Sequence, residues 1–179
     1  KLSARIIKPT LQGLQNRQID YKGFIFFGLI AVDGDPFVIE YNCRLGDPET
    51  QVILPRIQND LLSCFNAVFD GSLKNHVSLS PDQTCVAVVL ASGGYPEAYE
   101  KGKSIQIQRE LMEHETIFHA GTKDENEALL TSGGRVLACC ALAPDLPQAR
   151  NKAYDLVNEV NFEAMYYRKD IGVDLITHV

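Results

Sequence analysis

Polar and ionisable side chains gather at the end of an apolar stretch in the first third of the chain. There Glu40, Asn42 and Arg44 alternate with Ile39 and Tyr41. Alternate side chains of an extended strand point to the same face, which would place Glu40 and Asn42 about 6.6 Å apart on one side. A carboxylate and an amide oxygen, with room for water and phosphate oxygens, suit Mg²⁺, which takes few ligands from a protein.

The residues that follow extend this group of polar side chains. Arg44 could bind a carboxylate or a phosphoryl group through its forked guanidinium donors. The turn Gly46-Asp47-Pro48-Glu49 then adds two carboxylates on a backbone restricted by proline. The same pattern is also typical of a surface strand, and Asp47 and Glu49 could simply cap the turn and the next helix. Four charged groups and one amide within ten residues favour a phosphoryl-transfer site.

A helix and a β-hairpin are predicted to lead to this site. Apolar residues recur at roughly helical intervals within residues 2–18, with Pro9 suited to a first helical turn. Residues 21–32 and 37–43 are rich in aromatic and β-branched side chains. Because Asp33-Gly34-Asp35-Pro36 supplies turn residues between them, we expect an antiparallel hairpin.

A second helix and a domain boundary are predicted after the site. The helix would begin at Asn59 or Asp60 as its N-cap, bury one apolar face and end at Gly71. Residues 72–83 are polar and include Pro81, so the boundary is expected there. We therefore divide the chain into residues 1–80 and 81–179.

The second part is predicted to be a small antiparallel β unit covered by a helix, which makes the fold class α+β. Its apolar segments are separated by glycine-bearing turns. A helix is expected over residues 145–160, where apolar side chains recur every three or four positions. The expected strands are residues 84–91, 104–108, 116–120 and 134–143.

Composition narrows the functional class. The net charge of −6 argues against nucleic acid as a partner, and the chain holds no run of roughly 18 apolar residues that could span a membrane. Five cysteines, an odd number with one adjacent pair and no C-x-x-C, favour reduced thiols in the cytoplasm. The first residues lack a secretory signal and an initiator Met, so we expect the sequence to begin within a longer protein.

Several motifs together resemble the glycinamide ribonucleotide synthetase family, the phosphoribosylamine-glycine ligases of the ATP-grasp superfamily. The resemblance runs through nearly the whole chain and is most specific from Glu40 to Gln51, followed by Pro55. The weaker motifs are Tyr21-Lys22-Gly23, Gly94-Tyr95-Pro96 with Tyr99 and Lys101-Gly102, residues 118–122, residues 133–137 and residues 167–172.

The resemblance implies a fold and a reaction. Residues 1–80 would be the C-terminal part of an ATP-grasp catalytic lobe, and residues 81–179 the family's small β-rich C-terminal domain. The implied enzyme uses ATP to join glycine to 5-phosphoribosylamine in purine biosynthesis. It would form glycinamide ribonucleotide, ADP and phosphate through a glycyl phosphate intermediate.

The resemblance also implies roles for particular residues. Glu40 and Asn42 would hold Mg²⁺ or Mn²⁺, and Arg44 would stabilise the glycine carboxylate or the acyl phosphate. Asp47 and Glu49 would orient the amino substrate. Arg135 and Lys101 are further candidates, for the ribose phosphate, although the glycines beside them are also typical of ordinary turns.

Two departures from the family pattern qualify these expectations. Residues 24–32 contain no acid, whereas several other ATP-grasp enzymes carry a further metal-binding carboxylate on that strand. The family's N-terminal substrate domain and its lysine-bearing nucleotide-binding lobe would precede Lys1. We therefore expect this chain to be inactive without those domains. The alternatives are another ATP-grasp carboxylate-amine ligase or carboxylase, and a non-catalytic interaction domain derived from such an enzyme.

Overall fold

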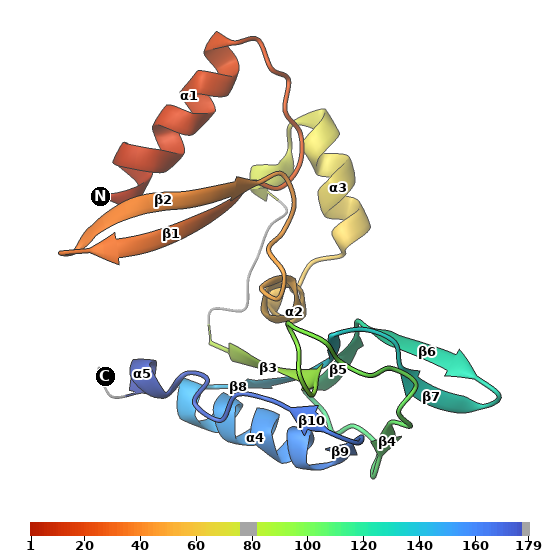
Figure 1. The fold of residues 1–179 in the computed structure, drawn as a ribbon. Helices are drawn as coiled ribbons and strands as arrows, with labels where there is room; N and C mark the ends of the chain where they lie inside the picture. Colours follow the sequence, from red (N-terminus) through yellow and green to blue (C-terminus); the bar gives the residue numbers. More distant parts are fainter. Residues whose placement is uncertain (76–81, 177–179) are drawn as a thin grey trace. The chain divides into compact units, whose positions relative to one another are not determined.

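The computed structural model describes residues 1–75 and 82–176 and has the expected α+β fold (Figure 1). Internal contacts divide the described chain into two units. The first contains residues 1–49 and 59–75, and the second contains residues 50–58 and 82–176. The boundary predicted near residue 80 stays a prediction, and the polar stretch assigned to it lies partly outside the described residues.

The first unit begins with the helix expected from the apolar spacing. A π-helical segment, Ser3–Ile7, runs directly into α1, Lys8–Asn16, with Pro9 in its first turn. Arg5 Nη1 lies 3.0 Å from Asp35 Oδ1. The Arg5 side chain therefore ties the start of this helix to the tip of the hairpin.

The hairpin consists of β1, Phe26–Val32, and β2, Asp35–Asn42. Asp33 and Gly34 both have positive φ, as a two-residue type I′ turn requires. Leu29 pairs with Val38 and Gly28 pairs with Glu40, so β2 has one extra residue at this point. The predicted hairpin is confirmed, but β1 begins five residues later than expected, and Asp35 and Pro36 belong to β2 instead of the turn. The hairpin also contains a β-bulge that the sequence pattern did not indicate.

Helix α3, Leu61–Asp70, completes the first unit together with a 3₁₀ turn, Leu73–Asn75. Asp60 is the N-cap, because its Oδ1 accepts a hydrogen bond from the Ser63 backbone N–H at 2.7 Å. Gly71 ends the helix in the left-handed conformation. Both ends agree with the sequence-based prediction.

The second unit is built on a four-stranded antiparallel sheet in the order β10-β3-β8-β5. Two further strand pairs, β4 with β9 and β6 with β7, stand beside it. The sheet strands are β3 Thr84–Ser92, β5 Glu115–His119, β8 Arg135–Ala143 and β10 Met165–Tyr166. The paired strands are β4 Gln106–Ile107, β6 Thr122–Glu125, β7 Ala128–Thr131 and β9 Val160–Asn161. Three of the four predicted strands are confirmed at nearly full length, whereas the fourth is reduced to β4.

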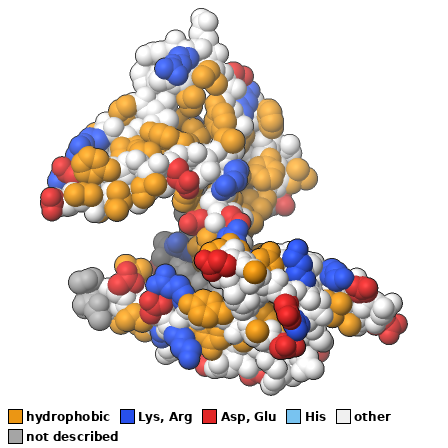
Figure 2. Space-filling model, in the orientation of Figure 1, with side chains coloured by type: hydrophobic (Ala, Val, Ile, Leu, Met, Phe, Trp, Pro, Cys, Tyr) orange, Lys and Arg blue, Asp and Glu red, His pale blue; other side chains and the backbone are white. Residues whose placement is uncertain are grey.

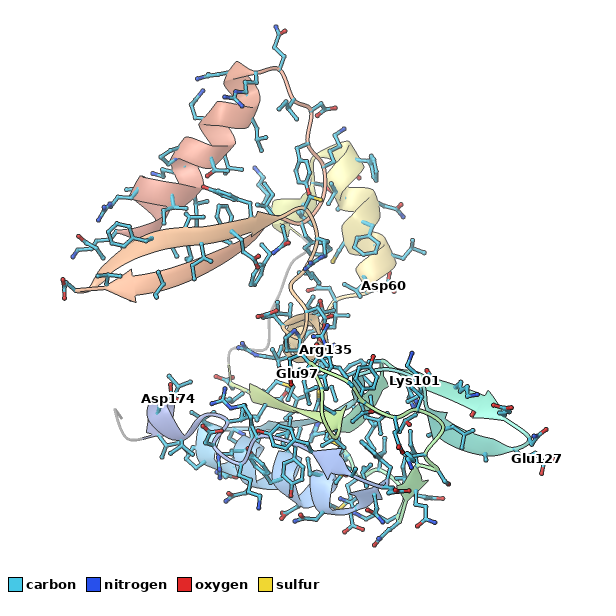
Figure 3. All side chains as sticks on the ribbon, viewed as in Figure 1. Asp60, Glu97, Lys101, Glu127, Arg135 and Asp174 are labelled. Carbon is cyan, nitrogen blue, oxygen red and sulfur yellow. The ribbon has the colours of Figure 1, made fainter. Side chains whose placement is uncertain are left out.

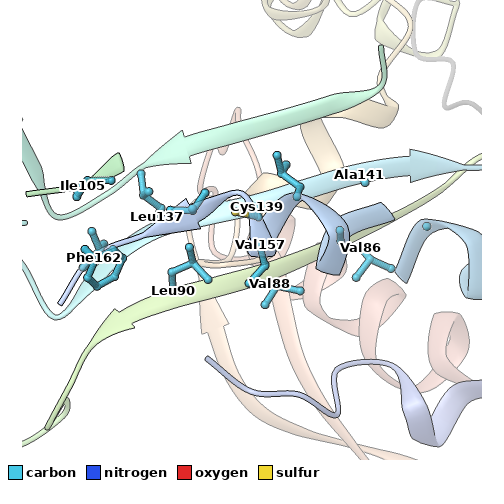
Figure 4. Close-up of a cluster of buried hydrophobic side chains, with 14 of the residues drawn as sticks. Val86, Val88, Leu90, Ile105, Leu137, Cys139, Ala141, Val157 and Phe162 are labelled. Carbon is cyan, nitrogen blue, oxygen red and sulfur yellow. The ribbon is translucent and has the colours of Figure 1, made fainter. Parts of the chain in front are cut away.

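Helices cover both faces of this sheet. Helix α4, Leu146–Asn158, begins at the N-cap Asp145 and packs on β3 and β8 around a core of buried hydrophobic side chains (Figure 4). On the other side lie α2, Thr50–Ile53, and a 3₁₀ turn, Leu54–Arg56, which contact the same sheet (Figure 1). A short α5, Val173–Ile176, follows β10.

Candidate functional site

The end of β2 carries the predicted metal ligands side by side. Asn42 Nδ2 donates a hydrogen bond to Glu40 Oε1 at 2.9 Å, which requires the two side chains to lie on the same face. Glu40 is exposed and Asn42 is half-buried. The hydrogen bond fixes the carboxylate and the amide relative to each other. It leaves Glu40 Oε2 and Asn42 Oδ1 as oxygen donors.

An aromatic ring from β1 lies beside this pair. Phe26 is paired with Asn42 across the hairpin, so both side chains stand on the same face. The Phe26 ring also packs against Gly46, since its Cε2 atom is 3.0 Å from where a Cβ on Gly46 would be. Phe26 therefore connects the end of β2 with the turn that follows. The sequence pattern identified its strand but not this position.

The turn from Gly46 to Glu49 holds one of the two added carboxylates against its own backbone. Gly46 is buried, and the Glu49 carboxylate occupies the space next to its Cα atom. Asp47 is exposed, and the Asp47–Pro48 peptide bond is cis. Arg44 is exposed at the start of the turn, where its Nη1 donates to the Leu45 carbonyl oxygen at 2.9 Å.

Tyr21 joins the segment before the hairpin to the segment after it. Its hydroxyl oxygen lies 2.6 Å from the carbonyl oxygen of Phe24 and 3.2 Å from that of Cys43. Cys43 separates Asn42 from Arg44 in the sequence, so this contact restrains the strand end that carries the site. The Phe24 ring in turn meets Phe65 of α3 edge-on, with centroids 6.2 Å apart.

The donor set fits a magnesium-like ion better than a closed transition-metal site. Within residues 1–75 and 82–176, no three His, Cys, Asp or Glu side chains come together as a metal cage. One carboxylate and one amide oxygen on an exposed strand end match an ion that completes its coordination with water and phosphate. Glu40 and Asn42 are the residues that would hold such an ion.

Glycine motifs of the second unit bring three loops together at one end of β3 and β8. Ser92 Oγ donates to the Gly133 carbonyl oxygen at 2.9 Å, and a Cβ on Gly121 would lie 2.5 Å from Gly133 Cα. The ring of Tyr95 packs so closely on Gly134 that any other side chain at this position would displace the ring. These glycines allow close backbone packing, which agrees with the interpretation of the glycine motifs as ordinary turns.

Arg135 and Lys101, the further candidates for phosphate binding, flank these loops (Figure 3). Arg135 is the first residue of β8 and is half-buried. Lys101 is exposed, and its Nζ lies 5.8 Å from the centre of the Tyr99 ring.

A cavity of about 490 Å³ lies beside the loop that follows β3. Ser92, Gly93, Tyr99, Lys103 and Glu163 contribute to its lining. Lys103 Nζ forms ion pairs with Glu100 Oε2 at 2.7 Å and with Glu163 Oε2 at 3.0 Å. The second ion pair connects the loop after β3 to the turn between β9 and β10. The sequence analysis did not predict these ion pairs.

No helix in the described part of the chain is both long enough and apolar enough to cross a lipid bilayer.

Comparison with known protein families gives two matches. Residues 85–174 match the family described as phosphoribosylglycinamide synthetase, C domain. Residues 1–50 match phosphoribosylglycinamide synthetase, ATP-grasp (A) domain. The second match includes all five predicted site residues from Glu40 to Glu49.

Individual relatives agree with these family matches. Phosphoribosylamine–glycine ligase of Chlorobaculum tepidum is 43% identical over 174 residues, which are 96% of this chain and 41% of that protein. The enzyme of Fusobacterium nucleatum is 41% identical over 175 residues with the same coverage. A bifunctional purine biosynthetic protein of Pichia angusta is 43% identical over 174 residues, 22% of its length.

The solved structure of phosphoribosylamine–glycine ligase from Thermotoga maritima is similar in fold, with a TM-score of 0.77 and 41% sequence identity. The similarity covers 90% of this chain and 40% of that one. The chain thus spans about two fifths of the length of the ligases it matches.

Proposed function

Since this chain belongs to the phosphoribosylglycinamide synthetase family, we propose that it forms part of an ATP-dependent ligase that joins glycine to 5-phosphoribosylamine. The products would be glycinamide ribonucleotide, ADP and phosphate, as in purine biosynthesis. The observation that carries the proposal is the hydrogen-bonded Glu40–Asn42 pair within the family's ATP-grasp match. The proposal concerns the longer protein, because this chain spans only part of its relatives.

The reaction needs a carboxylate to be activated before an amine can attack it. An oxygen of the glycine carboxylate would attack the γ-phosphorus of ATP, and ADP would leave. The amine nitrogen of phosphoribosylamine would then attack the acyl carbon, lose a proton and displace phosphate. Little covalent chemistry falls to the protein, so its contribution is charge stabilisation and positioning.

Glu40 and Asn42 would hold the divalent cation, Mg²⁺ or Mn²⁺. When bound, such an ion neutralises charge on the nucleotide phosphates. The Asn42 amide contributes by holding the Glu40 carboxylate in one conformation, which lowers the conformational entropy lost on binding. Both oxygens face the same side of the hairpin, where phosphate and water can complete the coordination.

The neighbouring charged residues would act on the substrates. Arg44 would stabilise the glycine carboxylate or the acyl phosphate through its guanidinium group, which is exposed and attached to a short, restrained turn. Asp47 and Glu49 would orient the amino substrate. Arg135 and Lys101 would attract the ribose phosphate, which their positive charge and proximity to glycine loops favour.

A cytoplasmic location agrees with the absence of disulfide bonds among the five cysteines. All five are free thiols, and three of them, Cys64, Cys139 and Cys140, are buried. Such unpaired thiols are usual in a reducing compartment.

The test is ADP release by the full-length enzyme, measured with and without glycine and phosphoribosylamine over a range of magnesium concentrations. Replacing Glu40 with Gln keeps its size and removes its charge, so we expect kcat to fall about a hundredfold, with partial rescue by high magnesium. The matched control is Glu113→Gln, because the Glu113 side chain is 90% exposed in the second unit. That variant should keep full activity.

Other outcomes would replace the proposal with one of its alternatives. ADP release that depends on a different acid or amine would indicate another ATP-grasp ligase. Nucleotide binding without turnover in the full-length protein would indicate an interaction domain derived from such an enzyme. Full activity of the Glu40→Gln variant would exclude Glu40 as a metal ligand.

A further inference from the structure

Gly28 occupies an unusual place opposite the Glu40 carboxylate. The two residues are paired across the hairpin, so their side-chain positions share one face. A Cβ atom built on Gly28 would lie 2.7 Å from Glu40 Cγ and 3.5 Å from Glu40 Oε1. A carbon–carbon contact of 2.7 Å is far inside van der Waals separation. Glu40 therefore occupies the space that any other residue at position 28 would fill.

The reason for glycine at this position is space and not backbone conformation. The glycines of this chain with left-handed φ are at other positions, such as Gly34 and Gly71. Gly28 lies within a strand whose backbone any residue could adopt. Glycine inside a strand is unfavourable because it loses more conformational entropy on folding than other residues do. A strand that retains it needs a compensating reason, and the Glu40 side chain provides one.

The β-bulge places Gly28 in this register. Counting outward from the Asp33-Gly34 turn without a bulge would pair Phe27 with Glu40. The extra residue in β2 shifts the pairing by one, so that Gly28 comes to lie opposite Glu40 and Phe26 opposite Asn42. Bulges commonly redirect a side chain at a functional position. Here the bulge and the glycine together let Glu40 lie across the hairpin, within reach of the Asn42 amide.

We propose that Gly28 is a positioning residue of the metal site, which sets the conformation of Glu40 by leaving room for its side chain. The proposal rests on the proposed function, because it assigns the Glu40–Asn42 pair to a divalent cation. An alanine at position 28 would force the Glu40 side chain into another rotamer. The Asn42 hydrogen bond would be lost, and the carboxylate would no longer be fixed beside the amide oxygen.

The chain offers a matched control for this substitution. Gly13 lies in α1, and a Cβ atom there would meet nothing within 4 Å. Gly13→Ala is the same chemical change in the same unit, without a collision. It should leave metal binding unchanged and should not lower thermal stability, because alanine favours a helix more than glycine does.

Metal binding is measured first, on the full-length enzyme with a non-hydrolysable ATP analogue. Free Mn²⁺ is followed by electron paramagnetic resonance during titration of wild type, Gly28→Ala, Gly13→Ala and Glu40→Gln. We expect Gly28→Ala to weaken Mn²⁺ binding about tenfold, as loss of a contact that orients a ligand commonly does. Wild-type affinity in Gly28→Ala, together with weakened binding in Glu40→Gln, would overturn the positioning role alone. Unchanged binding in Glu40→Gln would overturn the metal site itself and this proposal with it.

A stability cycle tests the collision even if Gly28→Ala folds poorly. Thermal unfolding is compared for Gly28→Ala in the wild-type and Glu40→Ala backgrounds. If the Glu40 side chain causes the conflict, Gly28→Ala should lower the melting temperature only when Glu40 is present. An equal shift in both backgrounds would show that position 28 does not act through Glu40.

Discussion

Polar contacts hold particular side chains in each unit, and Glu115 of the second unit is a well-buried example. Glu115 has a side chain that is 1% exposed and accepts two hydrogen bonds from Arg109, at 2.8 and 2.9 Å. The backbone N–H of Met112 donates to the same carboxylate at 2.9 Å. The Arg109 guanidinium holds the pKa of Glu115 below its ordinary value, and burial only partly opposes this shift. The pair fixes the loop that enters β5.

This geometry predicts an acid-dependent loss of stability. Because the folded-state pKa of Glu115 is lowered, its contribution is fully present above its unfolded-state pKa, near 4.5. It is lost as pH falls through the folded-state pKa. Glu115→Gln should reduce the free energy of unfolding at pH 7 by about 2 kcal/mol, because Arg109 loses its two-hydrogen-bond partner and keeps only the longer contact of 3.7 Å to Glu159.

Urea unfolding of this chain at pH 7 and at pH 4 tests this prediction. The destabilising effect of Glu115→Gln should be smaller at pH 4 than at pH 7, if the second unit still folds at both. The exposed Glu113→Gln variant serves as the control and should follow the wild type. An equal effect of Glu115→Gln at the two pH values would contradict the assignment.

At the scale of helices and strands, the residues of the candidate site divide into those that the sequence predicts and those that it does not. The alternation of residues 39–42 correctly placed Glu40 and Asn42 on one face, because period-two alternation depends only on the local strand. Phe26 and Gly28 were missed, because their place depends on the register between strands. A bulge changes that register without altering the hydrophobic pattern. An isolated glycine in a strand is the one signal that could have indicated it.

The helix ends show the complementary case, in which local chemistry sufficed. The Asp145 side chain accepts hydrogen bonds from the Gln148 backbone N–H at 2.8 Å and from its side-chain amide at 2.6 Å. Asp145→Ala should therefore reduce the free energy of unfolding by about 1 kcal/mol, through the loss of the N-cap. Asp145→Asn preserves an acceptor and should lie within a few tenths of a kcal/mol of wild type in urea unfolding. Equal losses in both variants would mean that capping is not the cause.

At the scale of the whole molecule, the two units differ in how much apolar surface they bury. Of the 22 buried hydrophobic residues in the described chain, only Ile6, Cys64 and Ala67 belong to the first unit. Large apolar side chains of that unit are exposed instead, among them Ile39 at 66%, Leu62 at 67% and Phe69 at 73%. Figure 2 shows such side chains gathered over the first unit. Composition could not reveal this difference, because exposure depends on tertiary packing and not on hydrophobic content.

The difference in burial predicts unequal stability along this 179-residue chain. Burial of apolar surface is the main stabilising contribution to folding, so amide hydrogens of β3, β8 and α4 should exchange slowly with solvent. Those of β1, β2 and α3 should exchange at least about a hundredfold faster, which corresponds to a difference of about 2.7 kcal/mol in opening free energy. Hydrogen-exchange mass spectrometry on this chain measures both sets of peptides at once.

A core substitution shows whether the two units open independently. Val88 is fully buried in the second unit, and Val88→Ala removes apolar contacts there and leaves a cavity. Exchange should accelerate in β3, β8 and α4, whereas the rates in β1 and β2 should stay the same. If all five elements accelerated together, opening would be one cooperative event across both units. In that case the two units would have the same opening free energy, even though the first unit buries fewer hydrophobic residues.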